Sequence, residues 1–128
     1  MPYVYINARK LDGQPKVGDF ECVALVRTYT NAPPSMVWRE GEKVLGNKEI
    51  APGTAIATFE NGRYPTHPKG KHAAFHLGQV SNGIYIVDQW DNPEKKTISI
   101  RFIYDKGKKK DGSFVTPSDN AAAFSIIK

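Results

Sequence analysis

The sequence predicts an α+β fold in which N-terminal helices pack on an antiparallel β-sheet. Two observations lead to this prediction. Apolar residues recur at helical spacing early in the chain, between residues 20 and 30. After residue 54, short segments with alternating apolar and polar side chains are separated by turn sequences, which is typical of consecutive antiparallel strands. By its length of 128 residues, the chain is expected to form one domain that covers residues 1–128.

The first part of the chain is predicted to contain one short strand and two helices. The stretch PYVYIN (2–7) alternates weakly and predicts a strand. Asp19 is the expected N-cap of a helix over about Phe20–Thr30, which the prolines of NAPP end. The stretch PSMVWREGEKVLG predicts a second helix, with Pro34 in its first turn and Gly46 at its end.

The remainder of the chain is predicted to be a meander of strands. These strands are expected, in chain order, at Thr54–Phe59, His72–Val80, Ile84–Trp90, 96–105 and 121–128. The stretch NGRYPTHPKGK (61–71) is a loop by its proline and glycine content, and SNG (81–83) is a hairpin turn. The lysine-rich stretch KGKKKDGS (106–113) is expected to be an exposed loop.

Composition and charge narrow the class of protein. The chain is 40% hydrophobic and 24% charged, as in ordinary globular proteins. No apolar run approaches the roughly 20 residues of a membrane span, so membrane insertion is not expected. The first residues, MPYVYINARK, lack the basic start and long apolar run of a secretory signal. The net charge of +5 favours an anionic partner, without choosing among nucleic acid, membrane surface, cell-wall polymer and acidic protein.

Cys22 is the only cysteine and stands at the beginning of the first predicted helix. An internal disulfide and a cysteine-rich metal site are therefore excluded. A lone cysteine in an apolar helix is often only a small buried side chain. The start of a helix nevertheless stabilises a thiolate, and its free N–H groups can bind an oxyanion. The preceding Glu21 would raise the pKa of the thiol unless it points away or a histidine offsets it.

Thiol catalysis needs a base, and His72 is the expected one. It lies at the beginning of a predicted strand, where a base can face a helix N-terminus across the domain. His76 lies in the same strand and is expected to be structural or at the rim, whereas His67 lies in a proline-rich loop. A zinc site made of these three histidines would lack any recognised ligand spacing, so neither a metal nor a cofactor is expected.

The third group should orient the histidine, and the stretch VDQWD offers Asp88 or Gln89. A three-residue hairpin turn pairs Val80 with Ile84 and puts Asp88 on the face of His72. A two-residue Asn-Gly turn shifts the pairing by one and presents Gln89 instead. Both registers stay open at this point. Asp88 is the first choice because an acid orients a histidine more strongly than an amide does.

Four segments in this order resemble the papain-like peptidoglycan amidases of the CHAP and NlpC type: GDFECVALVR, APGTAIATF, GKHAAFHLGQV and GIYIVDQW. The resemblance covers roughly residues 18–90. It implies a papain-like fold with Cys22 as the nucleophile, His72 as the general base and Asp88 as the orienting residue. The backbone N–H of Cys22 would then form one side of the oxyanion hole.

By its small size and the pattern HAAF…DQW, the chain resembles the type VI secretion amidase effectors, most of all those of family 3. This resemblance implies a protein made in the cytoplasm without a signal peptide. The type VI secretion apparatus would inject it into the periplasm of a neighbouring bacterium. There it would hydrolyse peptidoglycan peptide cross-links, for family 3 the bond from D-alanine to meso-diaminopimelate. A cognate immunity protein would protect the producer.

Two other functions stay open. The same fold would suit a papain-like peptidase or amidase of the producer's own wall or cytoplasm. A non-catalytic basic module would instead bind an anionic polymer such as nucleic acid through the loop at 106–110. The chain lacks the interleaved aromatic and basic residues of single-strand readers, so a nucleic-acid partner is not expected.

Overall fold

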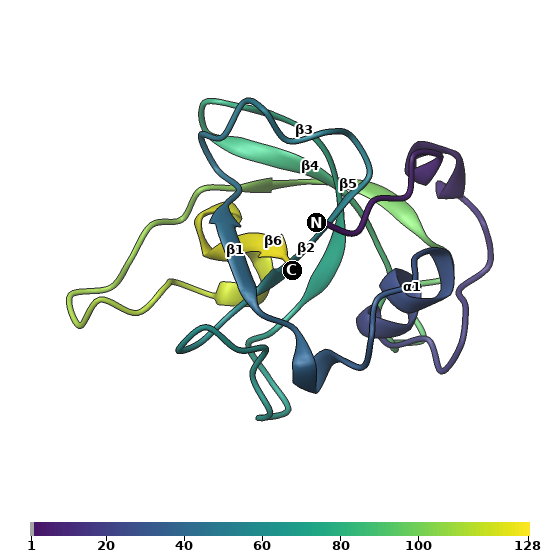
Figure 1. Ribbon diagram of the computed structural model, residues 1–128, viewed down its shortest axis with the longest axis horizontal. Coiled ribbons are helices and arrows are strands. Elements are labelled where there is room, and N and C mark those ends of the chain that lie inside the picture. Colours follow the sequence, from purple (N-terminus) through teal and green to yellow (C-terminus); the bar gives the residue numbers. More distant parts are fainter. Residues whose placement is uncertain (1) are drawn as a thin grey trace.

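A six-stranded antiparallel sheet organises the chain, as Figure 1 shows. This computed structural model describes residues 2–128. The strands are β1 (Glu40–Lys43), β2 (Thr54–Thr58), β3 (Ala73–Val80), β4 (Gly83–Asp88), β5 (Ser99–Tyr104) and β6 (Phe124–Ile127). Their order in the sheet is β1-β6-β2-β3-β4-β5, so β2 to β5 form a meander and β6 returns between β1 and β2. The helix α1 (Cys22–Tyr29) packs on β3, which confirms the α+β prediction.

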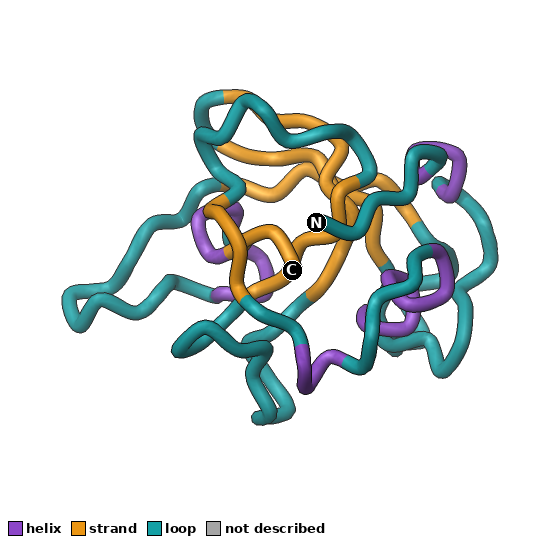
Figure 2. The backbone as a smooth tube through the Cα atoms, in the orientation of Figure 1, coloured by secondary structure: helices purple, strands orange, loops and turns teal. Residues whose placement is uncertain are grey.

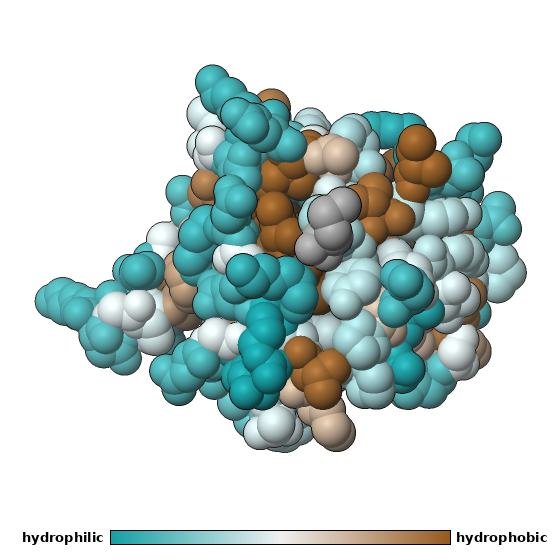
Figure 3. Space-filling view, in the orientation of Figure 1, coloured by the Kyte–Doolittle hydropathy of each residue, from teal (hydrophilic) through white to brown (hydrophobic). Residues whose placement is uncertain are grey.

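Short 3₁₀ turns and loops make up most of the remaining chain (Figure 2). The 3₁₀ turns are η1 (Ala8–Leu11), η2 (Ser35–Val37), η3 (Pro117–Asp119) and η4 (Ala121–Ala123). The lysine-rich loop at 106–113 is exposed, as expected, and its hydrophilic surface projects from the body of the molecule (Figures 1 and 3). Within residues 2–128, no helix has both the length and the apolar character needed to cross a membrane.

Two buried clusters hold the sheet, one on each face. Alternate side chains of a strand point to opposite faces, so Phe75 and its neighbour Ala74 belong to different clusters. The first cluster joins α1, through Leu25 and Val26, to the sheet. The second gathers mainly aliphatic residues on the other face: Val44, Ile56, Ala74, Ile84, Ile86, Ile103, Ala121 and Phe124. Burying one valine, isoleucine or phenylalanine side chain stabilises the fold by about 1.5–3 kcal/mol relative to leaving it exposed. Packing on both faces therefore holds the strands in place.

The hairpin between β3 and β4 has an irregular register. It closes with Val80 opposite Gly83, through a two-residue turn that neither of the expected registers describes. A β-bulge between His76 and Gly78 then adds one residue to β3. The expected turn geometry is therefore wrong in both of its versions.

The bulge decides which residue of β4 faces His72. A one-residue shift in register exchanges the two faces of a strand. The register of the turn alone would present Gln89 on the face of His72, and the bulge reverses this so that Asp88 lies there instead. Because β3 begins where β4 ends, His72 and Asp88 lie together at one end of the hairpin.

The second predicted helix, over 34–46, is wrong. Pro34 is extended and precedes only the short turn η2, after which the chain becomes the edge strand β1. Gly41 lies against β6 so closely that a Cβ atom would stand 2.8 Å from the carbonyl oxygen of Ile126. Pairing with β6 therefore decides the conformation of this segment, whose helix propensity Gly41 already lowers. Within residues 2–128, one α-helix packs on the sheet instead of the expected two.

Other predicted boundaries also change. The stretch at 2–7 is not a strand, since it makes only one isolated bridge, between Val4 and Thr54. The helix begins at Cys22 instead of Phe20, because Phe20 has a φ of 72° and cannot join a right-handed helix. Asp19 is not the N-cap, because its carboxylate accepts a hydrogen bond from the N–H of Glu21, which itself precedes the helix. The expected strands after residue 54 are all present, with ends that differ by up to three residues.

Candidate active site

Cys22 is the first residue of α1, and an unusual loop leads into it. Gly18 and Phe20 both have positive φ angles, of 61° and 72°. A Cβ atom at Gly18 would lie 2.8 Å from the side chain of Ala24, so only glycine fits there. A bulky residue such as Phe20 in this conformation is strained and persists only where its surroundings hold it.

The side chain of Gln89 holds this loop. Its Oε1 accepts a hydrogen bond from the N–H of Val17 at 2.9 Å, and its Nε2 donates to the carbonyl oxygens of Val17 at 3.0 Å and Glu21 at 2.8 Å. Gln89 is fully buried, so these bonds are shielded from water. The carbonyl of Glu21 shares a planar peptide with the N–H of Cys22. Gln89 therefore fixes the direction of the N–H group expected to bind an oxyanion.

His72 stands just before β3 and is held on both its backbone and its ring. Its N–H donates to the hydroxyl of Thr58 at 3.0 Å, and its carbonyl oxygen accepts from the N–H of Thr58 at 3.0 Å. The ring packs edge-on against Trp90 and Phe124, with centroids 6.1 and 6.4 Å away. Its Nε2 bonds Oδ2 of Asp88 at 2.8 Å, which leaves Nδ1 as the ring atom for Cys22.

Asp88 is a completely buried carboxylate with three cationic partners. Besides His72, it accepts from Nε and Nη2 of Arg101 at 3.0 and 2.8 Å, and Nζ of Lys95 lies 3.4 Å from its Oδ1. Lys95 also contacts the hydroxyl of Ser99. The β4–β5 register puts Ser99 opposite Asp88. Arg101 comes two residues after Ser99 in β5, so its side chain lies on the same face of the sheet. A buried charge is tolerated only with such partners, so this network determines the position of Asp88.

The three groups shift one another's pKa. Burial opposes ionisation of Cys22, but the hydrogen bond and charge of His72 outweigh it and hold the pKa of the thiol below 9.0. Burial also disfavours the imidazolium of His72, yet the bonds to Asp88 and Cys22 raise its pKa to about 9. Against burial, His72 and Arg101 lower the pKa of Asp88 to about 2. A thiolate–imidazolium pair is therefore the stable form between the lowered pKa of Cys22 and about pH 9.

Two further donors face the sulfur. The hydroxyl of Tyr64 lies 3.5 Å from Sγ of Cys22, and the backbone N–H of Ala73 also lowers the pKa of the thiol. Burial and the nearby thiolate raise the pKa of Tyr64, so its hydroxyl stays protonated and donates. Glu21, whose charge was expected to oppose the thiolate, is exposed to solvent.

The structure thus brings Cys22, His72 and Asp88 into one line and places Gln89 on the opposite face of β4. His67 lies away from this line and pairs with the exposed Glu60 at 2.8 Å. Among residues 2–128, no group of three or more His, Cys, Asp or Glu side chains could hold a metal ion.

His76 is buried in β3, directly next to the hairpin bulge. Its Nε2 contacts the side chain of Gln79 at 3.3 Å, and burial lowers its pKa to about 4. The imidazole is therefore neutral at physiological pH, whereas that of His72 is charged.

Sequence reasoning missed Tyr64, Lys95 and Arg101. Tyr64 comes from the loop at 61–71, whose path no periodicity predicts. The sequence did contain a signal for Arg101. An arginine among the apolar residues of β5 indicates that an anion lies near it in the fold. Its partner could not be predicted, because an irregular segment separates β4 from β5 and leaves the pairing register of these two strands undetermined by the sequence.

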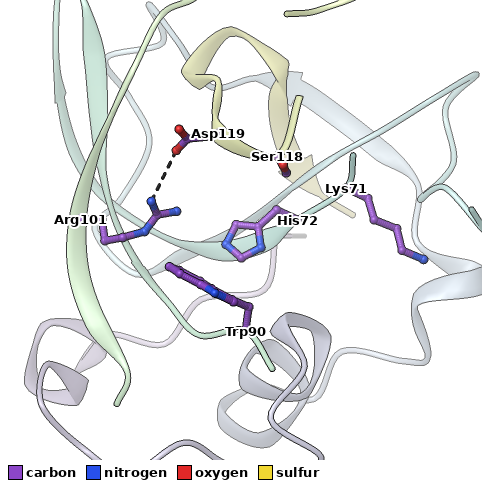
Figure 4. Close-up of a pocket in the computed structure, with 6 residues that line it drawn as sticks. All are labelled: Lys71, His72, Trp90, Arg101, Ser118 and Asp119. Carbon is purple, nitrogen blue, oxygen red and sulfur yellow. Dashed lines mark hydrogen bonds and ion pairs between the residues drawn. The ribbon is translucent and has the colours of Figure 1, made fainter. Parts of the chain in front are cut away.

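An open cleft of about 350 Å³ adjoins His72 (Figure 4). Such an arrangement can attack a carbonyl carbon with the thiolate, donate a proton from His72 to a leaving group and receive the developing oxyanion on backbone N–H groups. Acyl transfer from an amide or ester is therefore the chemistry that the geometry fits.

Comparisons with known proteins agree with this chemistry. The family model described as domesticated amidase effector 2 (Dae2) matches residues 4–126. A Salmonella typhi protein described as a type VI secretion amidase effector 2 protein is 44% identical over 133 residues, across 100% of both chains. A solved structure described as type 6 secretion amidase effector 2 (Tae2) is 43% identical, with a TM-score of 0.93 over 100% of this chain and 95% of that one.

These matches confirm the papain-like fold and the likeness to amidase effectors. The expected likeness to family 3 is wrong, because each match is to family 2. The expectation of family 3 rested on the small size of the chain and the pattern HAAF…DQW, and neither feature pointed to family 2.

The ion pair predicts rapid alkylation of Cys22 at neutral pH. At about pH 7, wild type should react with iodoacetamide about tenfold faster than His72→Ala, because the variant lacks the imidazolium that opposes the effect of burial on the pKa of the thiol. The chain has one cysteine, so the adduct mass reports Cys22 alone. His76→Gln is the matched control and should react like wild type. Equal rates for wild type and His72→Ala would contradict the ion pair.

The loop contacts predict a catalytic effect of Gln89. Replacing it with Leu should lower kcat about tenfold or more, since a small displacement of reacting groups has effects of this size. Gln79 offers a control, because it too accepts from one backbone N–H and donates to two carbonyls, those of Val44 and Asn47. Urea denaturation and kcat per folded molecule should show that Gln79→Leu affects stability alone. A similar loss of kcat in both variants would refute this role of Gln89.

Proposed function

The chain belongs to the domesticated amidase effector 2 family, and we propose that it is a cysteine amidase that hydrolyses peptide cross-links of peptidoglycan. The observation that carries the proposal is the line of contacts from Cys22 through His72 to Asp88. Amide hydrolysis requires a nucleophile and a proton donor for the leaving amine, and this line supplies both.

In the proposed reaction, Sγ of Cys22 attacks the amide carbonyl and the oxyanion forms beside the N–H of Cys22. Nδ1 of His72 then gives its proton to the leaving nitrogen, the C–N bond breaks and a thioester remains. His72 next removes a proton from water, which attacks the thioester and releases the acid and the thiolate. Asp88 keeps its negative charge throughout and holds the ring of His72 in one orientation.

Tyr64 and Ala73 stabilise the resting thiolate in this scheme. Their donors lie beside the sulfur before attack and lose part of their interaction once the thioester forms. They therefore favour the charged ground state and help to lower the pKa of the nucleophile.

Relatives described as type VI secretion effectors support a proposed route and place of action. We assign the type VI secretion apparatus as the delivery partner and the periplasm of a target bacterium as the site of action. A cognate immunity protein would then be needed in the producer. The bond from D-alanine to meso-diaminopimelate is the proposed scissile bond, and the net charge of +5 favours contact with an anionic wall polymer.

Muropeptide analysis tests this function. Purified peptidoglycan digested with wild type should lose cross-linked dimers and gain monomers, as measured by liquid chromatography and mass spectrometry. Cys22→Ala should lower the rate by about a thousandfold or more, because the nucleophile is removed. Lys108→Met, in the exposed loop, is the control and should digest like wild type. Unchanged muropeptides, or equal digestion by Cys22→Ala, would contradict the proposal.

A further inference from the structure

The cleft beside His72 has a defined set of walls (Figure 4). The lining residues are Lys71, His72, Trp90, Arg101, Ser118 and Asp119. In the close-up, Trp90 lies below the ring of His72, Arg101 to one side and Ser118 above, while Lys71 points outward at the rim. The cleft therefore begins at the proposed proton donor and extends away from it along polar walls.

Arg101 has donors left over for a ligand. Its guanidinium has five N–H groups, and Nε and Nη2 each use one on Asp88. Nη1 reaches Oδ1 of Asp119 at 3.4 Å, which is long for a charge-assisted hydrogen bond. Asp119 has a better partner in Nζ of Lys106 at 2.8 Å. An incoming acceptor can therefore replace Asp119 at Nη1 without breaking the bonds that hold Asp88.

The charges around the cleft do not balance. Lys71 and Arg101 line the cleft with a single carboxylate, Asp119. Outside the lining, Lys106 pairs with Asp119 and Lys95 pairs with the buried Asp88. The thiolate and imidazolium of the Cys22–His72 pair cancel each other. A cleft with a surplus of positive charge attracts an anionic group, and the planar guanidinium of Arg101 matches a carboxylate in particular.

The position of the cleft indicates which part of a substrate enters it. The leaving nitrogen must approach His72 within hydrogen-bond distance to take its proton. A carboxylate on the carbon that bears this nitrogen lies only two bonds further, about 2.5 Å. The cleft adjoins the same imidazole, so a group attached to that carbon has room to pass along the ring into the cleft, toward Arg101 and Ser118.

We propose that this cleft is a subsite for a free carboxylate on the leaving-amine side of the scissile amide, bound by Arg101 and Ser118 above the ring of Trp90. The inference rests on the proposed amidase function. An amide made on one amine of a diamino dicarboxylic acid keeps a carboxylate on the same carbon, whereas an internal α-peptide bond has a neutral amide there. The subsite thus selects wall cross-links, and also chain-terminal residues, over internal bonds of proteins.

A pair of matched substrates tests the subsite. Two cross-linked muropeptide dimers would differ only at the leaving-amine carboxyl group, free in one and a primary amide in the other. Wild type should cleave the acid about ten to a hundred times more efficiently by kcat/KM, the range for hydrogen bonds to a charged group. Ser118→Ala and Arg101→Lys should each reduce this acid-to-amide ratio. Asp119→Asn should raise it, because it removes the rival anion at Nη1.

The outcomes separate the subsite from the reaction. Lys108→Met changes an exposed lysine that does not line the cleft and should keep the wild-type ratio. Equal cleavage of acid and amide by wild type, lost in Cys22→Ala, would overturn the subsite and leave the amidase function intact. Cleavage of neither substrate would overturn both. Since Arg101 also bonds Asp88, Ser118→Ala is the decisive variant: an unchanged ratio there would exclude Ser118 from the carboxylate site.

Discussion

The buried carboxylate of Asp88 is the interaction on which the site depends. A charge with no exposure to water is stable only if its partners compensate for lost hydration, and His72, Lys95 and Arg101 do so. The same contacts give the site its chemistry. They turn Nδ1 of His72 toward Cys22 and fix Arg101 at the wall of the cleft. Burial lowers the pKa of the imidazole, but Asp88 and Cys22 together outweigh it and raise the pKa to about 9.

Asp88, the last residue of β4, and Gln89, which follows it, hold the two halves of the proposed catalytic pair. Because neighbouring side chains of a strand point to opposite faces, Asp88 faces His72 while Gln89 faces the loop before Cys22. Any movement of this strand end displaces His72 and the loop before Cys22 together. Phe20 keeps its strained conformation because Gln89 holds the loop around it: the Gln89 side chain accepts one hydrogen bond and donates two.

The order of Cys22, His72 and Asp88 along the chain could be predicted, because each follows a local signal: a helix start, a strand start and an acid at a strand end. The choice between Asp88 and Gln89 could not. It depends on a bulge near His76 that compensates for the turn, and nothing in the local pattern shows an extra residue. The helix predicted at 34–46 failed for a similar reason, since pairing with a strand about 80 residues later decides its form.

The central claim is that Asp88 keeps His72 protonated beside an ionised Cys22. A titration of the histidine ring nitrogens by ¹⁵N NMR tests it most directly. The account predicts that His72 stays an imidazolium at neutral pH and loses its proton at about pH 9, while His76 stays neutral down to about pH 4 and serves as an internal reference. A neutral His72 ring at pH 7, titrating at or below the ordinary value of 6.5, would contradict the account.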